Sequence, residues 1–253
     1  MNKDAHSTGP LKESHKPSAI RERLESGTEY SYLKDFIYGA IDGAVTTFAV
    51  VSGVVGAGLS SQIIIILGLA NLLADGFSMA AGNFLGSRAE TQRLEQIRQM
   101  EEKHIRDIPE GEKEEVRQIF AAKGFKGADL DRAVKIITAD PKQWVDTMIQ
   151  EEFGLPLSSP APVRAALATF IAFIAVGTMP LLVFIYPLVG GTPAAHPFFI
   201  SACMTGLAFF VVGALKGKFV GQKWYLSGLE TLFVGAIASG LAFGIGTLLK
   251  SIA

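Results

Sequence analysis

Residues 35–85 read DFIYGAIDGAVTTFAVVSGVVGAGL, then SS, then QIIIILGLANLLADGFSMAAGNFL. Both long runs are dominated by apolar residues, and between Gly43 and Ala74 there is no Asp, Glu, Lys or Arg. About 20 apolar residues in a helix cross the hydrocarbon core of a bilayer, and a soluble helix cannot cover so much apolar surface on all sides. With only Ser60 and Ser61 between them, the two runs predict a tight hairpin of transmembrane helices.

The rest of the chain repeats this pattern, with charged residues missing from residues 165–215 and 231–249. We therefore predict an all-α membrane protein with five transmembrane helices and a helical cytosolic insert between the second and the third. The predicted spans are Asp35–Leu59, Gln62–Leu85, Val163–Leu188, Pro197–Leu215 and Leu226–Leu249. The predicted domains are a flexible cytosolic N-terminal arm (residues 1–34), spans one and two (35–86), a cytosolic helical metal-binding domain, called the insert below (87–158), and spans three to five (159–253).

Basic residues indicate the orientation, because Lys and Arg near the ends of spans favour the cytosolic side. They occur before the first span, at the start of the insert and between the last two spans (Arg21, Arg23, Lys34, Arg88, Arg93, Lys216, Lys218, Lys223). The turns at residues 60–61 and 187–197 contain none. This pattern places the N-terminus and the insert in the cytosol and the C-terminus on the far side. Without a recognisable sorting signal, it favours a bacterial inner (plasma) membrane.

Composition argues against two other classes of protein. The net charge is −1, and the basic residues form no stripe with interleaved aromatics, so no nucleic-acid binding is expected. The single cysteine, Cys203, lies inside an apolar run and leaves no disulfide within one chain.

Polar side chains inside the spans are the first candidates for function, because a carboxylate at membrane depth costs roughly 2.5–3.5 kcal/mol and usually faces an interior pathway. Asn71, Asp75 and Met79 lie four residues apart and share one helix face. The short hairpin lets Asp42, followed one turn later by Thr46, face that stripe. Carboxylates, an amide oxygen and a thioether suit a borderline divalent metal better than magnesium or calcium. The alternative is that the aspartates hydrogen-bond across helices and Met79 only fills space.

The insert is predicted to be helical, with residues 87–105 continuing the second span and further helices at 112–123, 129–138 and 141–153. Three pairs have the spacing of ligands on one helix face: Glu101 with His104, Glu112 with Glu115, and Met148 with Glu152. Because Lys and Arg are interspersed there, a solvated charged face is the alternative. Glu-x-x-His is also half of a di-iron carboxylate site, but His104 is the only histidine in the insert.

Three stretches in the same order resemble the vacuolar iron transporter family: DFIYGAIDGAVTTFAVVSG (35–53), LLADGFSMAAGNFLGSRAE (72–90) and DPKQWVDTMIQEEFGL (140–155). The resemblance runs from about residue 35 to the C-terminus. It implies a homodimer whose first spans line a metal path, and exchange of cytosolic ferrous iron against protons. It also implies that Asp42 and Met79 belong to the path and that the insert binds metal through Glu101, Glu112, Glu115, Met148 and Glu152.

The chain departs from the family pattern at several of these positions. His104 stands where many members have Glu, Asn71 and Asn83 replace acidic residues, and Asp75 adds a carboxylate one turn from Asn71. These changes concern metal preference and proton coupling rather than the fold.

We therefore expect a transporter and not an enzyme: a proton-coupled exporter of Fe²⁺ first and Mn²⁺ second, with Zn²⁺ as a further ligand and no permanently bound cofactor. Its partners would be the lipid bilayer, the ions and a second copy of the chain. Two alternatives stay open from the residues alone. A membrane-bound ferroxidase would oxidise iron in an oxygen-dependent reaction that needs His104. A non-transporting scaffold would show no metal-dependent change in the insert.

Overall fold

The computed structural model describes residues 13–25 and 30–252, and within these ranges the secondary structure is entirely helical. Five helical segments among them are long and apolar enough to cross a membrane, which confirms the predicted fold class. The main helices are α2 (Pro17–Glu25), α3 (Leu33–Gly56), α4 (Ser61–Asp107), α5 (Pro109–Ala122), α6 (Gly127–Thr138), α7 (Pro141–Glu151), α8 (Pro162–Gly177), α10 (Pro197–Phe219) and α11 (Trp224–Leu249).

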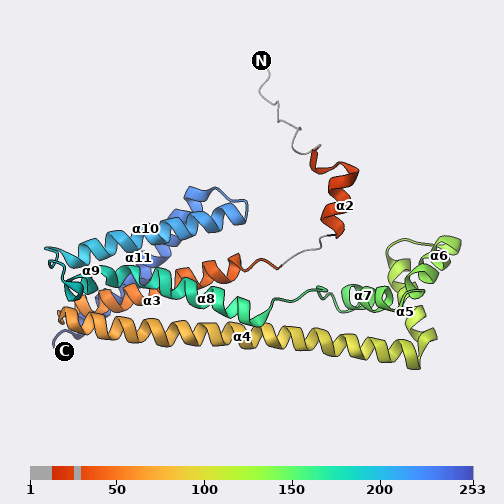
Figure 1. Cartoon of the computed structure of the whole chain (residues 1–253), viewed down its shortest axis with the longest axis horizontal. Helices are drawn as coiled ribbons and strands as arrows, with labels where there is room; N and C mark the ends of the chain where they lie inside the picture. Colours follow the sequence, from red (N-terminus) through yellow and green to blue (C-terminus); the bar gives the residue numbers. More distant parts are fainter. Residues whose placement is uncertain (1–12, 26–29, 253) are drawn as a thin grey trace, which may run out of the picture.

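Helix α4 connects the two ends of the molecule (Figure 1). It has 47 residues and is therefore about 70 Å long, more than twice the thickness of a bilayer core. Its apolar residues end near Leu85, and the predicted continuation beyond the second span is confirmed, because Gly86 does not interrupt the helix. The spans gather around the first half of α4, and α5–α7 lie at its far end (Figure 1). Anything bound near Asp107 is thus held well outside the apolar part of the bundle.

The third span covers Pro162–Val189, which confirms the predicted bounds of Val163–Leu188 to within one residue, but it is not one continuous α-helix. Helix α8 ends at Gly177, and the segment continues as a 3₁₀ turn (Met179–Leu181), α9 (Leu182–Ile185) and a second 3₁₀ turn (Tyr186–Val189). Both 3₁₀ turns contain a proline, Pro180 or Pro187, which cannot donate the helical hydrogen bond and clashes with the preceding turn. The hydroxyl of Ser201 on α10 donates to the carbonyl of Pro180 at 2.6 Å.

Helix α3 lies at the centre of the bundle and packs against α4, α8, α10 and α11. The small-residue pair Gly39 and Gly43 serves this packing: a Cβ at Gly43 would lie 2.4 Å from the carbonyl oxygen of Phe173 on α8. The pair Gly240 and Gly244 does not, because nothing in the described chain lies within 4 Å of a Cβ at either position. The first pair therefore explains contact within one chain, and the second lies on a face of α11 that no described residue contacts at these positions.

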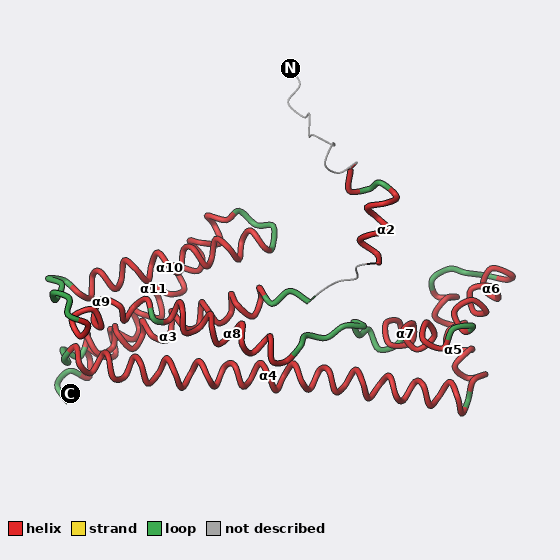
Figure 2. The backbone as a smooth tube through the Cα atoms, viewed as in Figure 1, coloured by secondary structure: helices red, strands yellow, loops and turns green. Residues whose placement is uncertain are grey.

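The insert has its own small core. Val116, Val134, Trp144 and Met148 form one buried cluster, and Ile97 of α4 joins Val145 and Ile149 of α7 in a second. As predicted, α7 begins after Asp140, whose carboxylate accepts a hydrogen bond from the Lys142 backbone N–H at 2.9 Å, with Pro141 in the first turn. Helix α5 begins at Pro109, one turn before the predicted start. An irregular segment then returns from α7 to α8 (Figure 2).

Most of the predicted N-terminal arm cannot be compared with the structure, because residues 1–12 and 26–29 lie outside the described residues. Within residues 13–25, Pro17–Glu25 form a helix. The flexibility of the arm stays a prediction.

Candidate metal-binding site and membrane path

Three predicted ligands from two helices meet at the far end of α4. His104 Nδ1 lies 3.6 Å from a carboxylate oxygen of Glu101 and 3.3 Å from one of Glu112. Each of the three residues can offer one ligand atom such that all three atoms lie within 4.8 Å of one another. Two carboxylates and an imidazole converging in this way are suited to holding a divalent cation.

The local sequence explains how the three residues come together. Glu101 and His104 occupy one face of α4 at a spacing of three residues. The chain then turns at Ile108, whose N–H donates to the His104 carbonyl at 2.8 Å. Pro109 starts α5 without needing a backbone donor, and the first turn of α5 carries Glu112 back over the face of α4. Proximity of Glu112 to the other two therefore depends on this turn.

Both carboxylates are buried to a degree that is rare for glutamate. Only 1% of Glu101 and 1% of Glu112 is exposed, and one oxygen of each makes no hydrogen bond within the described chain. The pKa of Glu101 is raised from 4.5 to about 8, mainly because the group is buried and secondly because the charges of Glu112 and Glu152 are nearby. Burial and the charge of Glu115 also raise the pKa of Glu112, against the opposing effect of His104. A bound cation would supply the missing partners for both groups.

The remaining predicted ligands of the insert surround this centre in different ways. Glu115 and Glu152 are exposed, and each adds to the negative charge felt by the buried pair. Partial burial, then Glu115 and Glu112, raises the pKa of Glu152. Met148 is fully buried in the hydrophobic cluster with Val116 and Trp144, so its packing role is plain and its role as a ligand stays a prediction.

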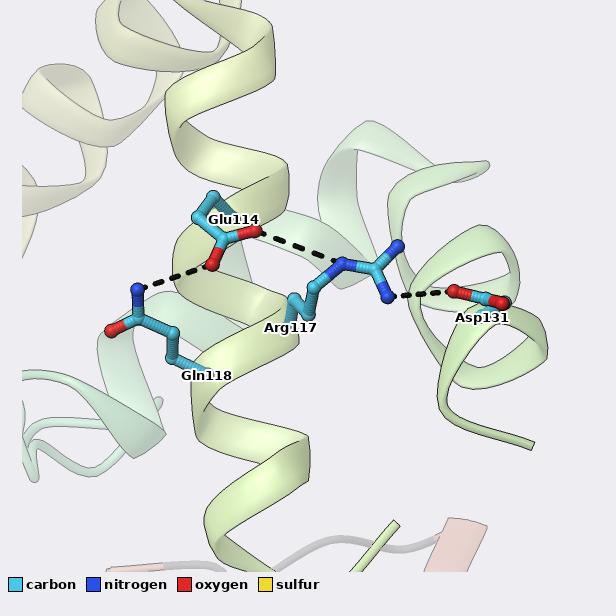
Figure 3. Close-up of polar contacts among 4 residues, drawn as sticks. All are labelled: Glu114, Arg117, Gln118 and Asp131. Atoms are coloured by element: carbon cyan, nitrogen blue, oxygen red, sulfur yellow. Dashed lines mark hydrogen bonds and ion pairs between the residues drawn. The ribbon is translucent and has the colours of Figure 1, made fainter. Parts of the chain in front are cut away.

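Other acidic residues of α5 form the solvated charged face that was the alternative interpretation. Glu114 is exposed and pairs with Arg117 at 3.7 Å, while Gln118 donates to its other oxygen at 3.2 Å (Figure 3). Arg117 also pairs with Asp131 of α6 at 2.6 Å. Glu112 and Glu114 are thus two residues apart and on different faces: one is buried beside His104, and the other is exposed and paired with residues of its own helix.

The insert is fastened to α4 close to the three ligands. Arg98 of α4 pairs with Asp146 of α7 at 2.9 Å, and both side chains are mostly buried. Together with the apolar contact between Ile97, Val145 and Ile149, this holds α7 in place beside the centre.

Within the bundle, the structure brings the predicted carboxylates of the first two spans together. Asp75 on α4 is close enough to Asp42 on α3 for their charges to interact. The hydroxyl of Thr46 donates to the Asp42 carbonyl at 2.9 Å, which leaves the hydroxyl oxygen free to accept or to bind a cation. Asn71 and Met79 are half-buried on the same helix as Asp75, and Asn71 Nδ2 has no hydrogen-bond partner in the described residues.

A second polar group, centred on Asp35 and Asn83, was not expected as a unit. The Asn83 amide nitrogen lies 2.9 Å from Asp35 Oδ1, 3.2 Å from the Ala165 carbonyl oxygen and 2.7 Å from Thr169 Oγ1, and these three acceptors share its two N–H hydrogens. It joins α3, α4 and α8 roughly two helical turns nearer the insert than Asp42 and Asp75. Sequence alone offered one signal: Asp35 lies seven residues before Asp42 and therefore on the same face of α3.

We expect Asn83→Ala to lower the free energy of unfolding by about 1–3 kcal/mol, because it leaves Asp35 and Thr169 buried without this donor. Asn71→Ala is the matched control on the same helix and should cost less, since the Asn71 amide nitrogen has no hydrogen-bond partner among the described residues. Thermal unfolding of the two purified variants in one detergent compares them. Equal losses would mean that the hydrogen bonds of Asn83 do not stabilise the bundle.

Comparison with known proteins identifies the family to which the chain belongs. The sequence profile of the VIT family matches residues 33–247, which cover all five spans and the insert. The chain belongs to the VIT family. This confirms the resemblance drawn from the three stretches of sequence.

Individual relatives are similar over nearly the whole length. A vacuolar iron transporter of Toxoplasma gondii is 36% identical over 249 residues, covering 96% of this chain and 79% of that protein. Vacuolar iron transporter 1 of Arabidopsis thaliana is 34% identical over 221 residues, 86% of each chain. A vacuolar iron transporter of Centaurea cyanus is 32% identical over 239 residues, 94% of this chain and 96% of the relative. These VIT relatives are named as transporters and not as enzymes, so this chain is assigned to a family of metal transporters.

Proposed function

We propose that this VIT-family protein exports Fe²⁺ from the cytosol in exchange for protons, and that the insert captures the ion. The observation that carries the proposal is the convergence of Glu101, His104 and Glu112 at the end of the helix that also bears Asp75, with one buried oxygen of each glutamate lacking a hydrogen-bond partner among the described residues. Iron is proposed as the cargo because the relatives are named vacuolar iron transporters. Mn²⁺ is proposed as a second cargo and Zn²⁺ as a further ligand of the same donors.

Electrostatics supports capture in the insert. The buried carboxylates of Glu101 and Glu112 lie close enough to the exposed ones of Glu115 and Glu152 for their negative charges to repel. Protonation or a bound divalent cation relieves this repulsion. Because ligands must be deprotonated to bind a metal, cation binding at Glu101 would release a proton. The insert would thus exchange protons for metal before transport begins.

The membrane path would lie along α3 and α4. Asp75 is 26 residues before Glu101 on one continuous helix, a separation of about 39 Å. Asp42 and Asp75 would bind the ion at membrane depth, with oxygens of Thr46 and Asn71 and the thioether of Met79 completing its shell. Protonation of an aspartate on the far side would release it.

A homodimer is proposed because one chain does not enclose this path. Asp42, Asp75 and Met79 are only half-buried in the single chain, so a second copy against α3 and α4 would remove them from lipid.

The basic loops favour an insert in the cytosol and a C-terminus on the far side. With this orientation, the protein would move metal out of the cytosol in either of two membranes. One is a bacterial inner membrane, which the sequence pattern favours. The other is a vacuolar membrane, after which the relatives are named.

The proposal is tested by Fe²⁺ flux into proteoliposomes in which the insert faces outward, with the lumen more acidic than the medium. We expect uptake that rises with the proton gradient and collapses when a protonophore dissipates it. Uptake that is independent of the gradient would remove proton exchange from the account. Absence of flux for Fe²⁺, Mn²⁺ and Zn²⁺, with folded protein of verified orientation, would overturn transport itself.

A further inference from the structure

The three converging residues of the insert differ in donor chemistry and in exposure. Glu101 and Glu112 offer oxygen, and their side chains are 2% and 1% exposed. His104 offers nitrogen, and its side chain is 41% exposed. The imidazole is therefore the member of this trio that an ion arriving from solvent meets first.

We propose that His104 sets the metal preference of the insert, so that cations which accept an imidazole nitrogen well, such as Fe²⁺, Co²⁺ and Zn²⁺, are captured in preference to Mn²⁺. The inference rests on the proposed capture of metal by the insert and specifies which ions are captured. It assigns selectivity to one residue, at the entrance to the buried pair.

The spacing around His104 fits direct ligation through Nδ1. Metal–nitrogen and metal–oxygen bonds of about 2.0–2.2 Å place neighbouring ligand atoms of a tetrahedral or octahedral shell roughly 3–3.6 Å apart. His104 Nδ1 lies 3.3 Å from the Glu112 oxygen and 3.6 Å from the Glu101 oxygen. His104 Nδ1 is thus already at the distances from both carboxylates that a small divalent cation requires, and the other oxygen of each glutamate is buried without a hydrogen-bond partner in the described part of the chain.

The nitrogen donor matters because the cations differ in how they rank oxygen and nitrogen ligands. Carboxylate, carbonyl and water oxygens suit Mn²⁺, whereas imidazole suits iron and zinc, and affinity at a given mixed site rises from Mn²⁺ through Fe²⁺ and Co²⁺. Replacing the imidazole with a carboxylate at the same position would turn the trio into an all-oxygen site. The competing explanation is that His104 only forms ion pairs with the two glutamates and does not touch the metal.

The test compares wild type with His104→Glu, as full-length protein in detergent at one fixed pH, titrated with Mn²⁺, Co²⁺ and Zn²⁺ by calorimetry. We expect the ratio of the Mn²⁺ to the Co²⁺ dissociation constant to fall by about tenfold or more in the variant. The control is Gln99→Glu, which adds a carboxylate at an exposed position of α4 and should leave the ratio unchanged, because it replaces only a surface hydrogen bond to Glu95 and no candidate metal ligand.

A spectroscopic measurement keeps the inference testable if His104→Glu folds poorly. The visible absorption of bound Co²⁺ should differ between wild type and His104→Gln, because a nitrogen ligand is lost. Binding with an unchanged ratio and an unchanged Co²⁺ spectrum would overturn the role of His104 while leaving capture by the glutamates intact. A wild type that binds none of the three ions would instead refute the proposed capture.

Discussion

Replacing Asp42 with asparagine is expected to reduce Fe²⁺ flux at saturating metal by at least about tenfold without preventing folding. The change keeps the shape of the side chain and removes one of the two carboxylates that α3 and α4 place near each other at membrane depth. A cation at membrane depth has little water to stabilise it, so loss of one carboxylate raises the barrier directly. The initial rate of metal entry into proteoliposomes measures the effect.

Glu230→Gln is the matched control, because it removes a carboxylate from another span, α11. Glu230 is mostly exposed and pairs with Lys216 of α10 at 3.0 Å. Its replacement should leave the rate within about twofold, as expected for an exposed ion pair. If Asp42→Asn transported at the wild-type rate, the path assigned to α3 and α4 would be wrong.

Replacing Glu101 with glutamine is expected to stabilise the metal-free insert, and increasingly so as the pH rises. The pKa of Glu101 is raised from 4.5 to about 8, so between these values the folded chain keeps a proton that the unfolded chain has lost. The wild type therefore loses stability as the pH rises through this window, and the loss is complete above about pH 8. Glutamine does not titrate, so the free energy of unfolding of the variant should exceed that of the wild type by on the order of 2–4 kcal/mol at pH 8.

The same substitution should weaken metal binding, since it removes a ligand. Fe²⁺ or Zn²⁺ should raise the unfolding temperature of the wild-type insert far more than that of the variant. Fluorescence of the buried Trp144 in a Trp224→Phe background reports on the insert alone, because the chain has two tryptophans. Glu102→Gln, at the next and exposed position, is the control. A wild type whose stability did not fall between pH 5 and 8 would show that Glu101 is not held protonated.

Prediction from sequence succeeded for structural features that depend on a single local property of the chain. Long charge-free runs indicated the membrane spans, and the lack of a strong breaker after Leu85 indicated that α4 continues into the insert. The interruption of the third span was missed, although Pro180 and Pro187 were visible. In a membrane span a proline is tolerated when neighbouring helices satisfy the freed groups, so its position does not tell whether the helix bends or breaks.

The candidate site shows a different limit. Helical spacing could pair Glu101 with His104, since both lie on α4. It could not separate Glu112, which is buried, from Glu114, which is exposed and paired, because the geometry of the turn at Ile108 decides which face of α5 meets α4. Asp35 was missed for a related reason: its partner Asn83 is 48 residues away, and only the packing of α3 on α4 brings them together.

The proposed mechanism has two parts: the insert captures the ion, and Asp42 on α3 helps to pass it through the membrane. Its most direct test is the initial rate of Fe²⁺ flux as a function of Fe²⁺ concentration for wild type, Glu101→Gln/Glu112→Gln and Asp42→Asn. We expect the insert variant to raise the half-saturating concentration about tenfold or more with nearly the same maximal rate, and Asp42→Asn to lose the maximal rate. An insert variant with an unchanged half-saturating concentration would rule out capture by the insert, and an Asp42 variant with a full maximal rate would rule out the proposed path.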